Sequence, residues 1–374
     1  MTENNYNEQL SLLALTKVRG LNAAHVMQLL QVTGCASDIF ANISDINEIL
    51  PGASSALIES LSDKSIFDRA AKELDFAEQN GIDVICYNSD RYPCRLRECS
   101  DAPAVLYSMG NADLNARHIV SVVGTRRITE YGKDLCNSFV TELASLLPDL
   151  LIVSGLAYGV DVCAHRAAIK TGIPTVGVMA HGLDRIYPAS HRNIAKEMLH
   201  NGGLITEYMS ETEPYKGNFL QRNRIVAGIS DATVVIESPS YGGSLVTASL
   251  ASGYMRDCFA FPGRVNDQFS IGCNEIIARN RAALITSAHD FVKAMNWDNR
   301  IKKKKNIEPE LFPQLSPVES KILEFLKNSE GGMQINQMVI ALDMPVSQVM
   351  PVLFELEMKG LIRTVAGGLY RIVM

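Results

Sequence analysis

The 374 residues of the chain are enough for two or three domains with a large buried core, and 47% of them are hydrophobic. No apolar run approaches the ~20 residues that a membrane helix needs. The polar start, Met1–Gln9, lacks the pattern of a secretion signal, so we expect a cytoplasmic protein with no membrane partner. A net charge of −6 argues against a uniformly basic protein that coats nucleic acid, but it is compatible with a local basic groove.

Residues 1–80 are predicted to form an N-terminal helical domain. Apolar residues recur at helical spacing, as in Ile66, Ala70 and Leu74. The segment KVRGLNAAHVMQLL, residues 17–30, is similar to a helix-hairpin-helix turn, which can hold a DNA phosphate on backbone N–H groups. Because few basic side chains surround this turn, a simple packing corner in a small helical bundle is the preferred interpretation.

From Gly81 the apolar pattern changes from helical spacing to short β-branched runs, most of them separated by amphipathic stretches of helix length. This alternation is typical of a parallel sheet covered by helices on both faces. Residues 81–297 are therefore predicted to form a doubly wound α/β domain. The predicted strands are Ile82–Tyr87, Val105–Tyr107, Ile119–Val123, Leu150–Val153, Thr175–Met179, Gly203–Thr206, Thr233–Ile236, Cys258–Phe261 and Ala283–Thr286.

The C-terminal part is predicted to be a linker followed by a small winged-helix domain. The linker, residues 298–315, carries the run Lys302–Lys305, which is either a solvated tether or a secondary attractant for DNA. Residues 316–374 contain three helical patterns and then two strand patterns around the turn Ala366-Gly367-Gly368. The predicted elements are about Val318–Lys327, Ile335–Ala341, Val346–Lys359, Leu361–Thr364 and Leu369–Val373.

The charge of this winged-helix domain favours a protein partner over DNA. Its third helix, VSQVMPVLFELEMKG, is apolar and acidic, whereas a helix that reads a DNA groove normally presents Arg, Lys, Asn or Gln. A transcription regulator is therefore the weaker interpretation. The domain's five basic residues are opposed by six acidic ones: Lys321, Lys327, Lys359, Arg363 and Arg371 against Glu319, Glu324, Glu330, Asp343, Glu355 and Glu357.

Three predicted strands end in glycine-containing turns that lead into helices. These turns are Gly124-Thr125-Arg126-Arg127, Ser154-Gly155 and Gly242-Gly243-Ser244. In an open parallel sheet such turns all lie at the carboxyl edge, where a phosphate can approach glycine backbone and the N–H groups that begin a helix. The sequence contains neither the G-x-G-x-x-G fingerprint nor a P-loop, so we expect a phosphate-rich ligand and no NAD or ATP cofactor.

A second candidate region, Tyr215–Arg224, interleaves cations, amides and aromatic residues. On a helix, Phe219, Arg222 and Asn223 fall on one face. Lysine and arginine can neutralise phosphates, and an exposed Phe219 can stack on an unpaired base. The alternative is that Phe219 belongs to the core and that the arginines form structural salt bridges.

The remaining chemistry-bearing residues indicate no metal site. The eight cysteines form no C-x-x-C pair and have no histidine cluster beside them, so reduced, mostly buried thiols are expected. Asp161 and His165 lie four residues apart on a predicted helix, which can make a metal pair or an acid–base couple. No third ligand lies near them in the sequence, so a structural contact or a helix-start carboxylate is the preferred interpretation.

Together these segments resemble the DprA family, also called Smf. The matching pieces, in the family's order, are VGTRR, SGLAYGVD with AHRAA, VGVMAHGLDRIYPASH, KGNFLQRNRIVAGIS, GGSLVTA and FPG. The resemblance implies an extended Rossmann-like core with an N-terminal helical domain similar to SAM folds and a C-terminal winged helix. It also implies a homodimer that binds incoming single-stranded DNA during natural transformation and loads the RecA recombinase onto it.

The resemblance also implies a set of DNA-binding residues. The family's G-[ST]-R turn falls on Gly124, Thr125 and Arg126, and its glycine-serine loop falls on Gly243 and Ser244. Arg127 and Gly155 join this set through the turns described above. Leu220 stands where proline is common in the family, and this departure affects the expected loop shape more than the site. The family's lysine, aromatic and R-N-R positions fall on Lys216, Phe219, Arg222, Asn223 and Arg224.

The main alternative is a nucleotide-processing enzyme of the phosphoribohydrolase type, whose core is also Rossmann-like. Its signature, P-G-G-x-G-T-x-x-E, requires a glutamate that acts at the ribose. Laying its G-T on Gly243-Ser244 puts Thr247 where that glutamate would be. Threonine cannot replace a carboxylate that must bear charge at the reacting sugar, so we expect no catalytic activity.

Overall fold

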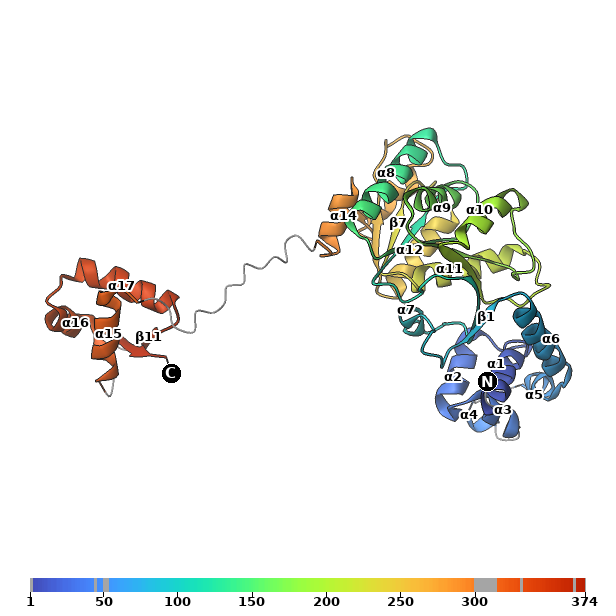
Figure 1. The fold of residues 1–374 in the computed structure, drawn as a ribbon, viewed down its shortest axis with the longest axis horizontal. Coiled ribbons are helices and arrows are strands. Elements are labelled where there is room, and N and C mark those ends of the chain that lie inside the picture. The colour runs from blue at the N-terminus through green and yellow to red at the C-terminus, as the bar shows by residue number, and fades with distance from the viewer. Residues whose placement is uncertain are drawn as a thin grey trace. The chain divides into compact units, whose positions relative to one another are not determined.

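The computed structural model describes residues 3–43, 46–49, 54–298, 315–329, 332–365 and 368–373, in two compact units, Met1–Trp297 and Asp298–Met374 (Figure 1). The predicted linker lies outside the described residues except at its ends, Asp298 and Leu315, so its lysine run is not described. Among the described helices, no single one is long and apolar enough to cross a membrane. Only α16 (Ile335–Leu342) and α17 (Val346–Met358) taken together reach that size, and a bend of 113° separates them.

The first unit begins with helices, as the apolar spacing predicts. Polar side chains cap two of them: Asn22 accepts a hydrogen bond from the His25 N–H, and Ser54 accepts one from the Leu57 N–H. The Asn22 side chain thus occupies a donor that a phosphate at this turn would use. The helices are α1 (Glu3–Leu15), α2 (Ala23–Thr33), α3 (Ala36–Ala41), α4 (Ile46–Ile49), α5 (Ser55–Ser62) and α6 (Ser65–Gln79).

These helices share a hydrophobic core with the sheet. Leu13 and Leu29 belong to the same buried cluster as Val105 and Tyr107, which lie on strand β2 (Val105–Gly110). A polar anchor joins the same regions. The buried Glu73 carboxylate of α6 accepts hydrogen bonds from the Ser210 N–H at 2.8 Å and from the Ser210 hydroxyl at 2.5 Å. The contacts therefore place α1–α6 and the sheet in one unit.

The described residues form a nine-stranded sheet in the order β1-β2-β6-β5-β4-β3-β7-β8-β9. Each β-branched run predicted from the sequence contributes one strand, which confirms the predicted α/β class. The remaining strands are β1 (Asp83–Cys86), β3 (His118–Val123), β4 (Leu150–Ser154), β5 (Thr175–Val178), β6 (Gly202–Thr206), β7 (Ala232–Val235), β8 (Asp257–Ala260) and β9 (Ala283–Leu284).

The sheet is mixed rather than wholly parallel. The strands from β6 to β9 in the spatial order are parallel, as predicted, whereas β1 and β2 extend the β6 side as antiparallel strands. A parallel crossover usually needs a helix that spans the sheet. The connection from β1 to β2 contains only the short helix α7 (Cys94–Arg97), so these strands pair in the antiparallel sense.

The direction in which strands are added reverses at β3. Strands β4, β5 and β6 lie on one side of β3, and β7, β8 and β9 lie on the other. Val120 of β3 is accordingly in register with Ile152 of β4 and with Ala232 of β7. In doubly wound folds this switch point opens a crevice at the carboxyl ends of the strands.

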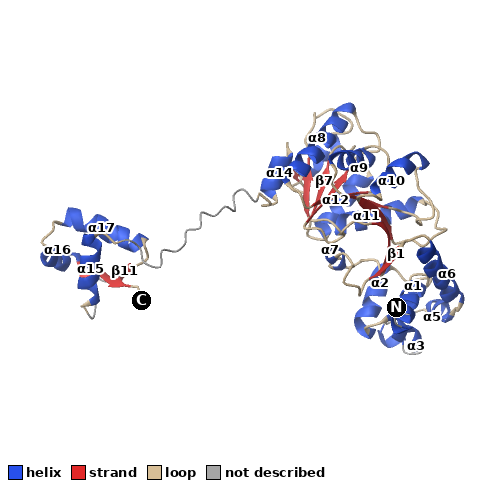
Figure 2. Cartoon of the chain, in the orientation of Figure 1, coloured by secondary structure: helices blue, strands red, loops and turns tan. Residues whose placement is uncertain are grey.

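Helices cover both faces of the sheet (Figure 2). Alternate residues of β3 point to opposite faces, so Val120 packs with α8 (Glu130–Leu146), α9 (Val160–Thr171) and α14 (Ala288–Ala294), and Ile119 packs with the other helix layer. That layer contains α7, α11 (Lys216–Gly228), α12 (Gly243–Gly253) and α13 (Ile271–Ala278). The helix α10 (Arg192–Met198) packs against β5 and β6.

The second unit is a winged helix, as predicted. Its described residues form α15 (Pro317–Lys327), α16 and α17 around a core that includes Ile322, Leu353 and Leu356. A capping box at Ser316 and Glu319 begins α15. The strands β10 (Met333–Gln334), β11 (Ile362–Val365) and β12 (Leu369–Ile372) pair in the order β10-β12-β11. Of the predicted hairpin turn, Ala366 and Gly367 lie outside the described residues.

Candidate functional site

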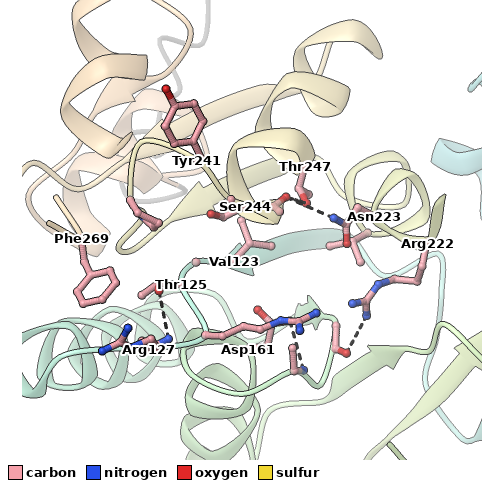
Figure 3. Close-up of a pocket in the computed structure, with 18 of the residues that line it drawn as sticks. Val123, Thr125, Arg127, Asp161, Arg222, Asn223, Tyr241, Ser244, Thr247 and Phe269 are labelled. Atoms are coloured by element: carbon pink, nitrogen blue, oxygen red, sulfur yellow. Dashed lines mark hydrogen bonds between the residues drawn. The ribbon is translucent and has the colours of Figure 1, made fainter. Parts of the chain in front are cut away.

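A cavity of about 380 Å³ opens at the switch point, beside the carboxyl ends of β3, β4 and β7 (Figure 3). Its volume falls in the range of about 300–1,000 Å³ that is typical of small-ligand sites. We call it the switch-point pocket. Nine of the predicted site residues line it: Gly124, Thr125, Arg126, Arg127, Gly155, Arg222, Asn223, Gly243 and Ser244.

The first turn of the pocket follows β3 and presents two cations. The Thr125 N–H donates to the Glu237 carbonyl at 2.7 Å, and the buried Thr125 hydroxyl accepts from the Arg127 N–H at 3.1 Å. This bonding fixes the backbone and leaves the Arg126 and Arg127 side chains exposed. Gly124 is required because a Cβ there would collide with Val160. The turn therefore holds two exposed guanidinium groups beside the pocket.

The second turn, at Ser154-Gly155, is held by a buried arginine. Arg222 is only 3% exposed, and its Nη1 donates to the Gly155 carbonyl at 2.7 Å and to the Val178 carbonyl. A Cβ at Gly155 would collide with this guanidinium. Burial lowers the pKa of Arg222, and the nearby Asp161 carboxylate opposes that shift. Arg222 thus belongs to the wall of the pocket and fixes the shape of the turn.

The third turn leads into α12 and leaves its first amides open. Among the described residues, no acceptor pairs with the N–H groups of Gly243 and Ser244, and no side chain caps the helix. The Gly243 carbonyl accepts from the Asn223 side chain at 3.3 Å and from the Thr247 hydroxyl at 2.9 Å. The Ser244 and Ser238 hydroxyls are 2.9 Å apart. The positive end of α12 therefore faces the pocket.

Helix α11 divides the remaining predicted residues between two sides. Lys216 is exposed at the first position of the helix, and Phe219 lies next to the Tyr187 ring and next to Arg126, which lines the pocket. Neither Lys216 nor Phe219 lines the pocket itself. Arg224 does not line the switch-point pocket. It is 6% exposed, forms an ion pair with Glu207, and donates to the Asp101 carbonyl at 2.5 Å. The structure therefore places Phe219 beside Arg126 of the pocket lining and engages Arg224 with other partners.

The Asp161 and His165 side chains face different partners. Asp161 lines the pocket, where burial raises its pKa and Arg222 acts in the opposite direction. His165 is fully buried, its Nδ1 lies 2.7 Å from the Thr175 hydroxyl, and burial lowers its pKa to about 3. In the described part of the chain, no group of three or more His, Cys, Asp or Glu side chains is arranged to hold a metal ion. The geometry favours structural roles for both residues.

Sequence reasoning missed one wall of the pocket. Gln268 and Phe269 line it from the loop after β8, and Tyr241 lines it from the turn before α12. The Arg127 guanidinium carbon lies 5.8 Å from the centroid of the Phe269 ring. The sequence did contain a signal for the loop after β8, because the predicted strand ends at Phe261. The loop that follows a parallel strand emerges at the carboxyl edge of the sheet, where the pocket lies.

Comparison with known proteins gives matches over both units. The family model described as DNA recombination-mediator protein A matches residues 83–296, and the DprA winged helix domain model matches residues 308–368. A putative DNA processing protein DprA from Mycobacterium tuberculosis is 33% identical over 307 residues, which cover 79% of this chain and 78% of that protein.

Two solved structures are similar to the chain. The X-ray structure of DNA processing protein A from Streptococcus pneumoniae has a TM-score of 0.67 at 31% identity, over 76% of this chain and 97% of that one. A DNA processing protein A structure from Helicobacter pylori, described for its single-stranded DNA binding mode, has a TM-score of 0.52 at 31% identity. That match covers 58% of this chain and 96% of the other.

Proposed function

Because this chain belongs to the DNA recombination-mediator protein A (DprA) family, we propose that it binds single-stranded DNA along the carboxyl edge of its sheet. The observation that carries the proposal is the switch-point pocket, where the open amides of α12 and the exposed Arg126 and Arg127 meet. Phosphates bind to open helix N-termini and to arginine in this way. The single-stranded DNA binding mode described for the Helicobacter pylori relative supports single-stranded DNA as the ligand.

In the proposed complex, backbone phosphates rest on the turns at Gly124-Thr125 and Gly243-Ser244, and Arg126, Arg127 and Lys216 add charge. The partly buried Phe219 ring stacks on an unpaired base. Stacking of this kind requires bases that are free of a partner strand. Duplex DNA should therefore bind less tightly than a single strand.

We assign Arg222 and Arg224 positioning roles in place of the phosphate contacts expected from the sequence. Both guanidinium groups are buried and already donate to protein groups. Arg222 shapes the Gly155 turn, and Arg224 holds the opposite side of α11. In this proposal the two arginines affect DNA binding indirectly, by maintaining the shape of the pocket.

Family membership supports a wider role for the bound strand. We propose that the protein acts as a cytoplasmic homodimer, protects incoming single-stranded DNA during natural transformation, and loads the RecA recombinase onto it. If so, adding the protein should shorten the delay before RecA hydrolyses ATP on strands covered by a single-strand-binding protein. An unchanged delay would remove RecA loading from the proposal and leave DNA binding in place.

We propose no catalytic step for the switch-point pocket. Thr247 stands where the phosphoribohydrolase glutamate would be, and its hydroxyl is engaged by the Gly243 carbonyl. The carboxyl group that does line the pocket, Asp161, is buried beside Arg222. Release of free base from nucleoside monophosphates by the pure protein would instead support the enzyme alternative.

A competition titration tests the proposed binding. A labelled oligo(dT) bound to the full chain is displaced with unlabelled oligo(dT) or with duplex of equal length. Single strand should compete better, and Lys216→Ala combined with Phe219→Ala should weaken binding. Lys170→Ala is the control. This exposed lysine lies in the last turn of α9, at the other end of the helix from the Ser154-Gly155 turn of the pocket. Equal competition by duplex, or equal binding by both variants, would contradict the proposal.

A further inference from the structure

A second cavity, of about 780 Å³, adjoins the switch-point pocket at the end of β8. The two cavities share Gln268 and Phe269 as a common wall. We call the second one the β8 cavity. Its lining comes from the start of α8, from the segment after β7 and from the loop between β8 and α13: Thr129, Tyr131, Glu237, Pro262, Gly263, Arg264, Asp267, Gln268, Phe269 and Ser270.

Two neighbouring arginines in the turn after β3 each lie close to a phenylalanine ring. The Arg126 guanidinium carbon lies 5.4 Å from the centroid of Phe219, and that of Arg127 lies 5.8 Å from the centroid of Phe269. Figure 3 shows Arg127 and Phe269 near one end of the pocket and Arg222, one helical turn after Phe219, near the other. The turn after β3 thus carries two cations, each beside an aromatic ring.

The β8 cavity repeats the same chemistry beyond Phe269. The Tyr131 side chain is 61% exposed, and Arg264 is exposed and forms no ion pair with any described residue. Both lie on the cavity wall. An exposed ring and a free cation at one site suit a base and its phosphate.

The acidic groups of the β8 cavity leave room for an anionic ligand. The buried Glu237 carboxylate accepts from the Thr129 N–H at 2.9 Å and from the Thr129 hydroxyl at 2.6 Å, so both of its oxygens are engaged within the protein. Asp267 is the other acidic group on the wall, and it is exposed to solvent, where salt and water screen its charge.

We propose that the β8 cavity is a second nucleotide subsite, which takes the continuation of the strand held in the switch-point pocket. This inference rests on the proposed function. Parallel strands lie only about 4.8 Å apart, so β3, β7 and β8 carry the two sites along one edge. The strand passes from Phe219 over the β3 turn to Phe269, and then to Tyr131 and Arg264. Tyr131 and Arg264 are binding residues of this second site.

Oligonucleotide length separates the two sites. The full chain and the variant Tyr131→Ala/Arg264→Ala are titrated by fluorescence anisotropy with single strands of roughly 5 and roughly 12 nucleotides, within the span of known single-strand sites. The short strand fills the switch-point pocket alone and should bind both proteins equally. The longer strand should bind the wild-type chain more tightly, and the double variant should lose about tenfold of that affinity.

The matched control is Tyr6→Ala/Arg117→Ala, which removes an exposed tyrosine of α1 and an exposed arginine just before β3, at the opposite edge of the sheet. This variant should bind both strands as the wild type does. As a second measurement, long strands carrying 5-iododeoxyuridine are cross-linked by light to the wild-type chain, and a labelled peptide should contain Tyr131, which lines the β8 cavity and not the switch-point pocket.

The outcomes distinguish the two proposals. A double variant that keeps the full affinity for the longer strand, or cross-links that never reach Tyr131, would overturn the second subsite while leaving the proposed function intact. A wild-type chain that binds neither strand would overturn the proposed function itself.

Discussion

The Arg126 guanidinium lies over the Phe219 ring, with 5.4 Å between the guanidinium carbon and the ring centroid. The two residues belong to different elements, since Arg126 follows β3 and Phe219 is in the first turns of α11. The pair places a charge and a stacking surface side by side. Their contributions to binding can be separated, because one depends on salt and the other on the bases.

Replacing Arg126 with alanine should weaken single-strand binding and reduce its salt dependence. Arg126 is exposed and has no ion-pair partner among the described residues, so it is free to neutralise a phosphate. The slope of log K against log salt should fall by about 0.7 for each lost contact with a single strand. Anisotropy titrations at several salt concentrations measure the slope, with Arg117→Ala as the control. An unchanged slope would mean that Arg126 does not touch phosphate.

Phe219→Ala should weaken binding to normal strands by about 1–3 kcal/mol per stacked base and leave the salt slope unchanged. A strand of abasic sites should bind Phe219→Ala and the wild type alike, because it offers no base to stack. Phe219→Tyr keeps the ring and should retain most of the affinity. If Phe219→Ala weakened the abasic strand equally, the ring would be acting through the fold rather than through stacking.

Arg222→Met should lower the stability of the protein and leave the salt dependence of DNA binding unchanged. The substitution leaves the Gly155 and Val178 carbonyls without their donor, at a cost of about 1–3 kcal/mol each. Urea unfolding measures the stability, and the salt slope of residual binding should match that of the wild type. A lower slope at unchanged stability would show that Arg222 binds phosphate directly.

Deleting residues 316–374 should leave most of the single-strand affinity, because the site lies within the first unit and the lysines at 302–305 are retained. The outer face of α17 also suits protein better than DNA. Val346, Met350, Phe354 and Met358 recur every four residues and are exposed. A large loss of affinity in an anisotropy titration would assign DNA contacts to the winged helix.

His165 should make the protein less stable in acid. Its pKa is about 3 in the folded state, against 6.5 for the free side chain, so the unfolded chain binds a proton first as the pH falls. The stability is therefore complete above pH 6.5 and declines below it, by about 2 kcal/mol at pH 5. Urea unfolding at pH 7.5 and pH 5 measures the stability that each protein loses between the two pH values. This loss should be smaller for His165→Gln than for the wild type, by about 2 kcal/mol. Equal losses in the two proteins would contradict the assignment.

The strands and the three glycine turns could be predicted because local pattern determines them. Each β-branched run is followed by a turn, and the geometry of parallel sheets brings the turns after β3, β4 and β7 to one edge. The antiparallel pairing of β1 and β2 was harder to predict. It depends on the length of α7, which the periodicity of apolar residues does not reveal.

The roles of the α11 arginines could not be read from the sequence, because their partners come from distant segments. Helical geometry puts Arg222 and Arg224 about 200° apart around the axis. One reaches the carbonyls of Gly155 and Val178, and the other reaches Glu207. The local sequence around Arg222 and Arg224 does not indicate which acceptors either side chain reaches. For Gln268 and Phe269 the strand end at Phe261 indicated a loop at this edge, but not which residues of the loop line the pocket.

The cluster that joins α1–α6 to the sheet limits how the chain can be shortened. Cutting before β1 would uncover Val105 and Tyr107, and would leave the Ser210 N–H without the Glu73 carboxylate. An uncovered apolar sheet margin invites self-association. The six helices thus cover strand β2 at the margin of the sheet, and a shortened chain is expected to precipitate.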